Sequence, residues 1–399
     1  MLMQRKQKKL QRKNKIIKMK LKSSLLMLSL VIFVCGLHAQ KSNPWKKGIL
    51  VDEFVYDTAS FPECHASTIV ETPKGLVTAF FGGTKERNPD VEIWVCRQEN
   101  GHWTKPVSVA NGIQNDTLRY PTWNPVLYQV PNGPLLLFYK VGPSPALWKG
   151  WMKTSLDNGK TWSAAKNLSD IGGLIGPVKN KPVLLPNGVL LAPSSTEGDG
   201  WRVHFEASKD FGKTWTNVGP INDGKTTNAI QPSILIYKDG RLQIIARSKE
   251  RALLQSWSTD NGKTWSPLTK TELPNNNSGT DAVTLKDGRQ LLVYNHVLPP
   301  ADAKNGKGAR TPLNLAWSKD GKTWYAAAIL EDSPISQYSY PSIIQSKDGM
   351  VHVVYTWRRQ KIKYVKIDPS KLNGVKIVNG EWPAMKGYKI TVVTEPSND

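Results

Sequence analysis

Polar residues of six different types begin six similar apolar segments of this 399-residue chain. Each segment is a short apolar stretch that ends in a glycine turn, as in "QPSILIYKDG" and "YPSIIQSKDG". The residues are His65, Asn124, Lys181, Gln231, Asp281 and Tyr340. These types include a base, a nucleophile, a cation and several hydrogen-bonding groups, which is the composition of a catalytic or binding pocket. If the fold brings them together, acid–base or nucleophilic chemistry is expected there.

Charged residues gather in the loops that follow the second apolar stretch of these segments. The candidates are Glu86, Arg87, Asp90, Arg247, His296 and Arg358. Asp90 in "GGTKERNPD" and Arg247 in "IIARSKE" lie at or just after the end of the second apolar stretch of their units. We predict that both belong to the site. We interpret Glu86, Arg87 and Arg358 as solvated loop charges.

A second recurring motif, Gly-Lys-Thr, suggests phosphate binding at first sight. It occurs in "SLDNGKTW", "SKDFGKTW", "STDNGKTW" and "SKDGKTW". A phosphate-binding loop needs another glycine five residues before the first, and the chain has Thr154, Ala207, Trp257 and Ala316 there. The motif instead predicts a hairpin turn, because its aspartate accepts backbone N–H groups and its glycine takes a positive φ.

Both motifs repeat at the spacing of one structural unit. The motif aspartates Asp157, Asp210, Asp260 and Asp320 are 53, 50 and 60 residues apart. The turn glycines of the apolar segments are Gly75, Gly133, Gly188, Gly240, Gly288 and Gly349. A unit of about 55 residues with two hairpins has room for four strands, which is typical of a β-propeller blade. The sequence therefore predicts an all-β fold, a six-bladed β-propeller with four-stranded antiparallel blades.

The ring is predicted to close through the chain's early residues. "GILVDEFVYD" precedes the first unit and can supply the outer strand of the last blade. We expect one propeller domain over residues 45–399 and no second domain. Because the first strand of each blade lines the axis, the six polar residues are expected to converge at its mouth.

The S-x-D-x-G-x-T-W copies resemble the Asp-box, and the chain is similar to the sialidase superfamily of six-bladed propellers. The resemblance covers roughly residues 61–368. It implies a carbohydrate-active enzyme in which three arginines clamp a carboxylate, an aspartate acts as acid/base, and a tyrosine paired with a glutamate is the nucleophile. In this family the Asp-boxes lie on the blade rim, away from the active site.

Carried over position by position, the resemblance assigns three residues. Asp90 matches the acid/base aspartate, Arg247 the second arginine and Tyr340 the nucleophile. Two positions depart from the family: His65 stands where the first arginine is expected, and Gln231 stands where the glutamate is expected. The third arginine is not placed, and the fifth blade has Asn295 and His296 nearby.

Three functions follow as hypotheses. The first is exo-acting glycoside hydrolysis of acidic glycans that contain sialic or uronic acid: Asp90 is the acid, Tyr340 or an activated water attacks, and Asp281 replaces the missing glutamate. The second is a uronate-specific polysaccharide lyase in which either His65 or Tyr340 removes the C5 proton and the other donates to the departing sugar. In both, Arg247 and Lys181 hold the carboxylate, and Asn124, Gln231 and Asp281 complete the substrate site.

The third hypothesis is a carbohydrate-binding propeller without turnover. Its sugar-stacking candidates are Trp94, Trp123, Trp148, Trp201 and Trp357. An assay of released products separates the three functions.

The first 22 residues contain ten Lys or Arg and no acid, and an apolar run ending in "GLHA" follows. This layout predicts a signal peptide over residues 1–39 that is cleaved after Ala39, and hence a secreted or periplasmic protein without a lasting membrane span. Without those 22 residues the net charge is +12, which favours an acidic oligo- or polysaccharide as partner and not, after export, a nucleic acid.

The remaining cysteines, Cys64 and Cys96, are too few for a disulfide framework, and we expect thiols. Five histidines are scattered without zinc-like spacing, so no metal and no cofactor are predicted. A closed propeller needs no partner chain, and a monomer is expected.

Overall fold

The computed structural model describes residues 3, 12, 13, 15, 43–386 and 388. The chain divides into two compact units, residues 1–43 and 44–399. The predicted signal peptide and its cleavage site at Ala39 lie outside the described residues, apart from helical Met3, Arg12, Lys13 and Lys15. No helix among the described residues has the length and apolarity needed to cross a membrane.

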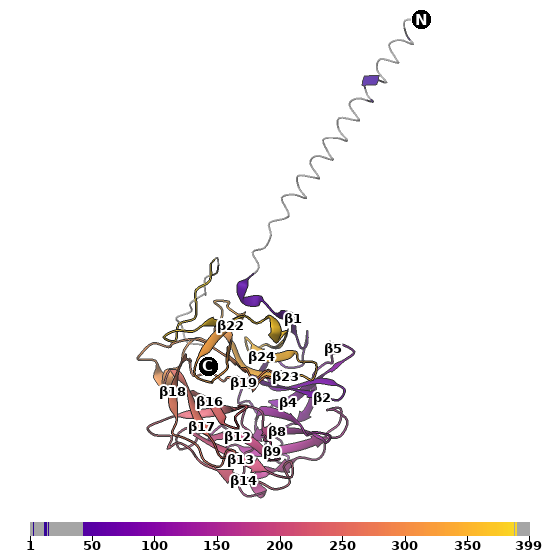
Figure 1. The fold of residues 1–399 in the computed structure, drawn as a ribbon. Helices are drawn as coiled ribbons and strands as arrows, with labels where there is room; N and C mark the ends of the chain where they lie inside the picture. Colours follow the sequence, from indigo (N-terminus) through magenta and orange to yellow (C-terminus); the bar gives the residue numbers. More distant parts are fainter. Residues whose placement is uncertain (1–2, 4–11, 14, 16–42, 387, 389–399) are drawn as a thin grey trace. The chain divides into compact units, whose positions relative to one another are not determined.

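The second unit is built from small antiparallel sheets, as predicted (Figure 1). Blade 1 contains β2 (Glu63–Thr72), β3 (Gly75–Gly83), β4 (Glu92–Glu99), β5 (His102–Trp103) and β6 (Val107–Ala110). Blade 2 contains β7 (Thr122–Gln129), β8 (Leu135–Val141), β9 (Lys149–Ser155) and β10 (Lys166–Asn167). Blade 3 contains β11 (Val183–Leu184), β12 (Leu190–Thr196), β13 (Arg202–Ser208) and β14 (Thr216–Val218).

The other three sheets continue the ring. Blade 4 contains β15 (Ala229–Ile236), β16 (Leu242–Ser248), β17 (Ala252–Ser258) and β18 (Thr269–Pro274). Blade 5 contains β19 (Asp281–Thr284), β20 (Gln290–Tyr294), β21 (Leu313–Ser318), β22 (Trp324–Glu331) and the added strand β26 (Val375–Lys376). Blade 6 contains β23 (Tyr338–Gln345), β24 (Val351–Trp357), β25 (Lys361–Ile367) and β1 (Ile49–Phe54). Single-turn 3₁₀ helices are η1 (Pro44–Lys46), η2 (Leu168–Asp170), η3 (Lys304–Gly306) and η4 (Pro369–Lys371).

The ring closes through β1, which pairs antiparallel with β25 as predicted. In Figure 1 the indigo strand β1 accordingly lies beside the late strands of blade 6. The inner strand β2 of blade 1 also contacts β23 of blade 6, so the first and last blades are neighbours. A buried apolar cluster that includes Val55, Phe80 and Tyr364 fills the space between these two blades.

The Gly-Lys-Thr motifs form the predicted turns between the third and fourth strands of their blades. In one of them, Asp210 accepts hydrogen bonds from the backbone N–H of Thr214 at 2.8 Å and of Lys213 at 3.1 Å. Gly212 adopts a φ of +97°, which side chains disfavour. The Thr214 hydrogen bonds lower the pKa of Asp210 to about 2, so this carboxylate stays charged and holds the turn. The motif is structural.

Cys64 and Cys96 are both free, buried thiols, as expected. Burial raises the pKa of Cys64 to about 12, which leaves it a neutral thiol at physiological pH. The Tyr56 hydroxyl donates to its sulfur at 3.1 Å.

Ring closure leads to a stability prediction. Val55 follows β1, is 1% exposed and donates its N–H to the Ile362 carbonyl at 2.9 Å. Val55→Asp places an unpaired carboxylate in the cluster between blades 1 and 6, and we expect it to lower the free energy of unfolding by at least about 3 kcal/mol. Leu50→Asp, on the solvent side of β1 with Leu50 49% exposed, serves as the control and should cost little. Urea unfolding measures both, and equal losses would refute the role of this closure.

Candidate functional site at the propeller axis

The inner strands present side chains to the axis through repeated β-bulges. Between His65 and Thr68 of blade 1, two residues of the inner strand face a single residue of the next strand, and the same irregularity recurs in the inner strands of blades 2, 4 and 6. At each bulge a non-glycine residue takes a positive φ: Ala66, Asn124, Gln231 and Tyr340, with φ of 57°, 32°, 57° and 53°. Such backbone conformations are uncommon and concentrate where a bulge re-aims a side chain.

The position of the bulge changes which residue of blade 1 is equivalent to Tyr340 of blade 6. The sequence analysis treated His65 as the counterpart of Tyr340, but the residue with positive φ is Ala66. By strand register, His65 corresponds to Ser339, because each is the last residue paired before the bulge. The stretch "HAST" stands where blades 2, 3, 4 and 6 have an X-Pro pair, and this hid the offset.

Tyr340 lies at the centre of the contacts that join the blades. Arg247 Nη1 donates to the Tyr340 hydroxyl at 2.7 Å and to Gln231 Oε1 at 3.3 Å. The rest of the guanidinium is held by Asn277, whose side-chain and backbone oxygens accept at 3.1 Å and 2.8 Å. Arg247 is only 6% exposed, so these bonds fix its orientation.

His65 packs against this tyrosine with its ring tilted by 49°. The two ring centroids are 4.1 Å apart, and His65 Nδ1 shares a 2.9 Å hydrogen bond with Thr356 Oγ1. Burial, followed by the positive charges of Arg359, Arg310, Arg247 and Lys179, holds the pKa of His65 well below its usual value. The imidazole is therefore neutral at physiological pH, with one nitrogen able to accept a proton. We call His65, Gln231, Arg247 and Tyr340 the axial cluster.

Two arginines missed by the sequence analysis lie beside the axial cluster. The Arg310 guanidinium carbon is 5.7 Å from the Tyr340 ring centroid, and its Nη1 donates to Gln337 Oε1 at 2.9 Å. Arg359 is close enough to depress the pKa of His65 and binds Glu86 of the β3–β4 loop. Arg310 lies just before the third strand of blade 5, and Arg359 lies just after the second strand of blade 6. These positions at strand ends are the sequence features from which both could have been predicted.

Arg358 of the "RR" pair, interpreted from the sequence as a solvated loop charge, has its contacts outside the axial cluster. Arg358 turns away from the axis: its Nε donates to the Tyr338 hydroxyl at 3.3 Å, and its guanidinium carbon is 4.5 Å from the Trp357 ring centroid. Glu86 was interpreted as a solvated charge, but it pairs with Arg359. The direction in which each of two adjacent arginines points depends on the turn after β24 and is not encoded in residue type.

Lys181 and Asp281 form a network among the blades beside the axis. Lys181 Nζ lies 2.8 Å from Asp281 Oδ2 and 2.9 Å from the Ala282 carbonyl. Asp281 is 1% exposed and also accepts from Ser233 Oγ and from the Ile343 N–H, both at 2.9 Å. These contacts join blades 4, 5 and 6, so the carboxylate already has the partners that a buried charge requires. Asp281 is therefore poorly suited to replace the missing glutamate beside Tyr340.

Asp90 lies on a loop of blade 1, and Asn124 lies on the inner strand of blade 2. Asp90 is exposed on the β3–β4 loop, where its Oδ2 accepts from the N–H and hydroxyl of Thr84 at 2.9 Å and 2.6 Å. The same loop reaches the axis through the bond between Glu86 and Arg359. Asn124 is 5% exposed at the bulge of β7, the inner strand next to β2.

Glu197 is a further carboxyl that the sequence analysis did not select. It follows β12, is half-buried, and lies within electrostatic reach of Arg247, Lys249 and Glu86. Burial raises its pKa, against the opposing effect of Arg247, Lys249 and Arg87. In the same loop, the Trp201 ring centroid is 5.2 Å from the Arg247 guanidinium carbon and 4.7 Å from Lys249 Nζ.

The other tryptophans suggested for sugar stacking lie elsewhere. Trp123 and Trp148 are buried against each other, with ring centroids 5.9 Å apart, and Trp94 Nε1 donates to the Gly82 carbonyl at 3.0 Å. Trp357 packs against Phe54 of β1. Trp201 is therefore the one of the five that contacts a residue of the axial cluster.

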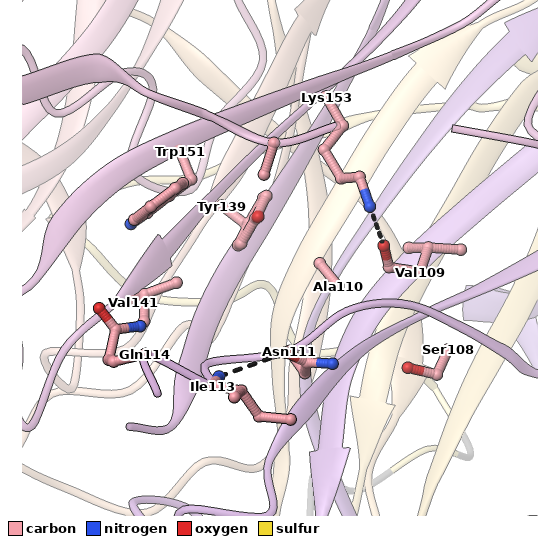
Figure 2. A pocket seen from close by; sticks show the side chains of 11 residues that line it. Ser108, Val109, Ala110, Asn111, Ile113, Gln114, Tyr139, Val141, Trp151 and Lys153 are labelled. Carbon is pink, nitrogen blue, oxygen red and sulfur yellow. Dashed lines mark hydrogen bonds between the residues drawn. The ribbon is translucent and has the colours of Figure 1, made fainter. Parts of the chain in front are cut away.

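A groove far from these contacts separates blades 1 and 2. It has a volume of about 350 Å³ and is lined by residues 108–114 together with Tyr139, Trp151 and Lys153 (Figure 2). Lys153 Nζ donates to the Val109 carbonyl across it at 2.7 Å. None of the predicted site residues lines it. Among the described parts of the chain, no group of three or more His, Cys, Asp or Glu is arranged to hold a metal ion.

The fold and these motifs agree with comparisons to known proteins. Residues 74–353 match the BNR repeat-like domain, and the chain belongs to this family. The resemblance to sialidase-type propellers is thereby confirmed at the level of fold. No curated protein matches the sequence.

Several solved structures share the propeller. A protein of unknown function from Dyadobacter fermentans DSM 18053 is similar with a TM-score of 0.65 and 18% identity, covering 82% of this chain and 100% of that one. The Hadza microbial sialidase Hz136 gives 0.67 and 16%, covering 81% and 69%. The intramolecular trans-sialidase of Ruminococcus gnavus, in complex with oseltamivir carboxylate, gives 0.62 and 14%, covering 80% and 97%.

The raised pKa of Glu197 predicts a pH effect on stability. Because the folded state holds this proton more tightly than the unfolded state, stability falls as pH rises from the ordinary glutamate value of 4.5 through the raised pKa. Glu197→Gln removes this dependence, so its melting temperature should exceed that of the wild type more at pH 8 than at pH 4. Thermal unfolding across this range is the measurement, with exposed Glu99→Gln as control. A pH-independent difference between Glu197→Gln and wild type would disprove the assignment.

Proposed function

We propose that this protein is an exo-acting glycoside hydrolase of sialidase type that acts on acidic glycans after export from the cytoplasm. The observation that carries the proposal is the contact between Arg247 and the Tyr340 hydroxyl, surrounded by further cations. Arg310 and Arg359 converge on the same cluster from blades 5 and 6. This arrangement suits a substrate carboxylate held beside a nucleophile, because guanidinium groups bind carboxylates through paired, charge-assisted hydrogen bonds.

In this mechanism the arginines orient the sugar by its carboxylate. Asp90, as a carboxylic acid, gives its proton to the glycosidic oxygen as the bond from that oxygen to the anomeric carbon breaks. Tyr340 Oη forms a bond to the anomeric carbon, and its proton passes to neutral His65. Water then displaces Tyr340, giving one proton to the Asp90 carboxylate, while His65 returns its proton to the phenol oxygen.

His65 fills the place that Gln231 leaves vacant in this scheme. A glutamine amide cannot take up the phenol proton, whereas a neutral imidazole 4.1 Å from the tyrosine ring, centroid to centroid, can. Arg247 Nη1 faces the phenol oxygen, so negative charge that develops there during attack meets a fixed donor.

The same His65–Tyr340 pair favours a second candidate, a uronate lyase. In it the cations neutralise the uronate carboxylate, His65 removes the C5 proton, and Tyr340 donates its proton to the departing sugar oxygen as a C4–C5 double bond forms. The elimination consumes no water, and His65 afterwards returns its proton to the phenol oxygen.

Product analysis decides between them. Purified protein is incubated with an aryl sialoside, an aryl glucuronide and uronate-containing oligosaccharides. The hydrolase releases reducing ends without new ultraviolet absorbance, whereas the lyase forms an unsaturated, ultraviolet-absorbing product. Binding of these glycans in calorimetry without either product would reject both enzymes and support the third reading, a carbohydrate-binding propeller.

The clamp role of Arg310 leads to a kinetic prediction. Arg310→Met removes one charge-assisted hydrogen bond to the substrate carboxylate, worth about 1.5–3 kcal/mol, and should raise KM about 10- to 100-fold. Arg358→Met, which removes the neighbouring guanidinium that binds Tyr338, is the matched control and should leave KM within about twofold. Initial rates on whichever acidic substrate is turned over supply both values. Equal KM values for the two variants would argue against the clamp.

The role of His65 can be tested separately. His65→Gln keeps a hydrogen-bonding side chain but removes the proton acceptor, and we expect kcat to fall by at least about 100-fold. Asp90→Asn should fall as strongly for the hydrolase and far less for the lyase, which does not use Asp90. Retention of full turnover by His65→Gln would exclude both schemes as written.

A further inference from the structure

A buried lysine beneath the axial cluster has no part in the mechanism above. Lys179 lies between η2 and β11, on the approach to blade 3, and is 3% exposed. Its ammonium donates to the Thr280 carbonyl at 2.7 Å and to the Pro341 carbonyl. One side chain of blade 3 thus binds the backbones of blades 5 and 6 at the axis.

The carbonyl that it binds belongs to the residue after Tyr340. Tyr340 and Pro341 form the bulge of β23, where they fall outside the regular pairing with β24. The φ of Tyr340 is 53°, a conformation that a tyrosine keeps only when its surroundings hold it. Lys179 supplies such a restraint one peptide away.

The lysine stem and the tyrosine ring also share one small neighbour. A methyl group on Gly279 would lie 3.1 Å from Tyr340 Cδ2 and 3.3 Å from Lys179 Cε. The Lys179 ammonium is 6.0 Å from the Tyr340 ring centroid. Glycine at this position therefore lets the stem and the ring approach closely.

Burying an amine here is costly, and the surrounding charges increase that cost. Burial lowers the pKa of Lys179 to about 7, Asp281 of blade 5 opposes this, and Lys181 and Arg247 of blades 3 and 4 add to it. Burial also lowers the pKa of Lys153 in the groove between blades 1 and 2, where its ammonium binds a backbone carbonyl at 2.7 Å (Figure 2). Both ammonium groups therefore bind backbone carbonyls, Lys179 at the axis and Lys153 in the groove.

We propose that Lys179 is a positioning residue that holds Tyr340 in the orientation needed for its reaction. It acts through the Pro341 carbonyl and the packing around Gly279, and its ammonium is occupied by two backbone carbonyls and not by substrate. The kinetic part of this inference rests on the proposed function, since it requires that Tyr340 reacts with an acidic glycan.

The first test is Lys179→Met, which keeps the stem and removes the ammonium. We expect kcat to fall about 10- to 100-fold, as for a misplaced catalytic group, with KM within about twofold of wild type. Lys153→Met is the matched control and should change neither constant. An unchanged kcat in Lys179→Met, or a rise in KM alone, would overturn the proposal.

A second test does not depend on turnover. The protein is labelled with 3-fluorotyrosine, and the Tyr340 fluorine resonance is assigned by its loss in Tyr340→Phe. This resonance should shift or broaden in Lys179→Met and in Gly279→Ala, which keeps the ammonium but intrudes on the ring, and stay in place in Lys153→Met. An unmoved resonance in both variants contradicts the positioning role, whereas a moved resonance in a protein that turns over no acidic glycan contradicts only the proposed function.

Discussion

The pairing of β1 with β25 is the constraint on which the rest of the propeller depends. It joins residues 49–54 to the end of the repeat array, so the first and last blades share one apolar cluster and no blade is left with an open face. Only in a closed ring do side chains almost three hundred positions apart meet. The 2.9 Å hydrogen bond between His65 and Thr356 is one result.

Closure of the ring places the inner strands side by side. The bulges then determine which side chains of these strands point toward the axis. A regular strand alternates its side chains between two faces, whereas a bulge turns an extra residue out of that alternation. In blades 4 and 6 this residue is Gln231 and Tyr340, and both reach Arg247. The unusual backbone of these positions is thus tied directly to the candidate chemistry.

The electrostatic character of the axis depends on which charged side chains are paired there. The carboxylates nearest to it are engaged: Asp281 with Lys181 and Glu86 with Arg359. Arg247 and Lys179 donate mainly to neutral oxygens, and Arg310 donates to the Gln337 side chain. Burial, followed by the charges of Arg359, Arg310, Arg247 and Lys179, lowers the pKa of His65, and the cations favour an anionic ligand at the mouth over a neutral one.

Gln231 and His65, the two departures from the sialidase pattern, both change the charge of this arrangement. Gln231 is uncharged where the sialidase pattern has a glutamate, and burial together with the surrounding cations keeps His65 of blade 1 unprotonated. In the proposed hydrolase mechanism, His65 takes the place of the missing carboxylate as the acceptor of the Tyr340 proton.

Much of the architecture could be read from the chain by itself. The spacing of the Asp-box aspartates and of the turn glycines determined the number of blades, because each blade is a local unit whose turns need particular residues. Strand β1 was also predictable, since an apolar segment before the first unit had no partner within it. Tyr340 and Gln231 were selected because they begin equivalent apolar segments of two units, and Arg247 because it lies at the end of the second apolar stretch of its unit.

Only the tertiary structure decided the rest of the site. Whether Arg358 or Arg359 enters the axis depends on the path of a turn, and the contribution of Arg310 depends on how a long connection of blade 5 folds back. The engagement of Asp281 and the support of Tyr340 by Lys179 both cross between blades. A repeat pattern records which residues recur within a unit, but contacts between units form at distances in sequence that no local pattern encodes.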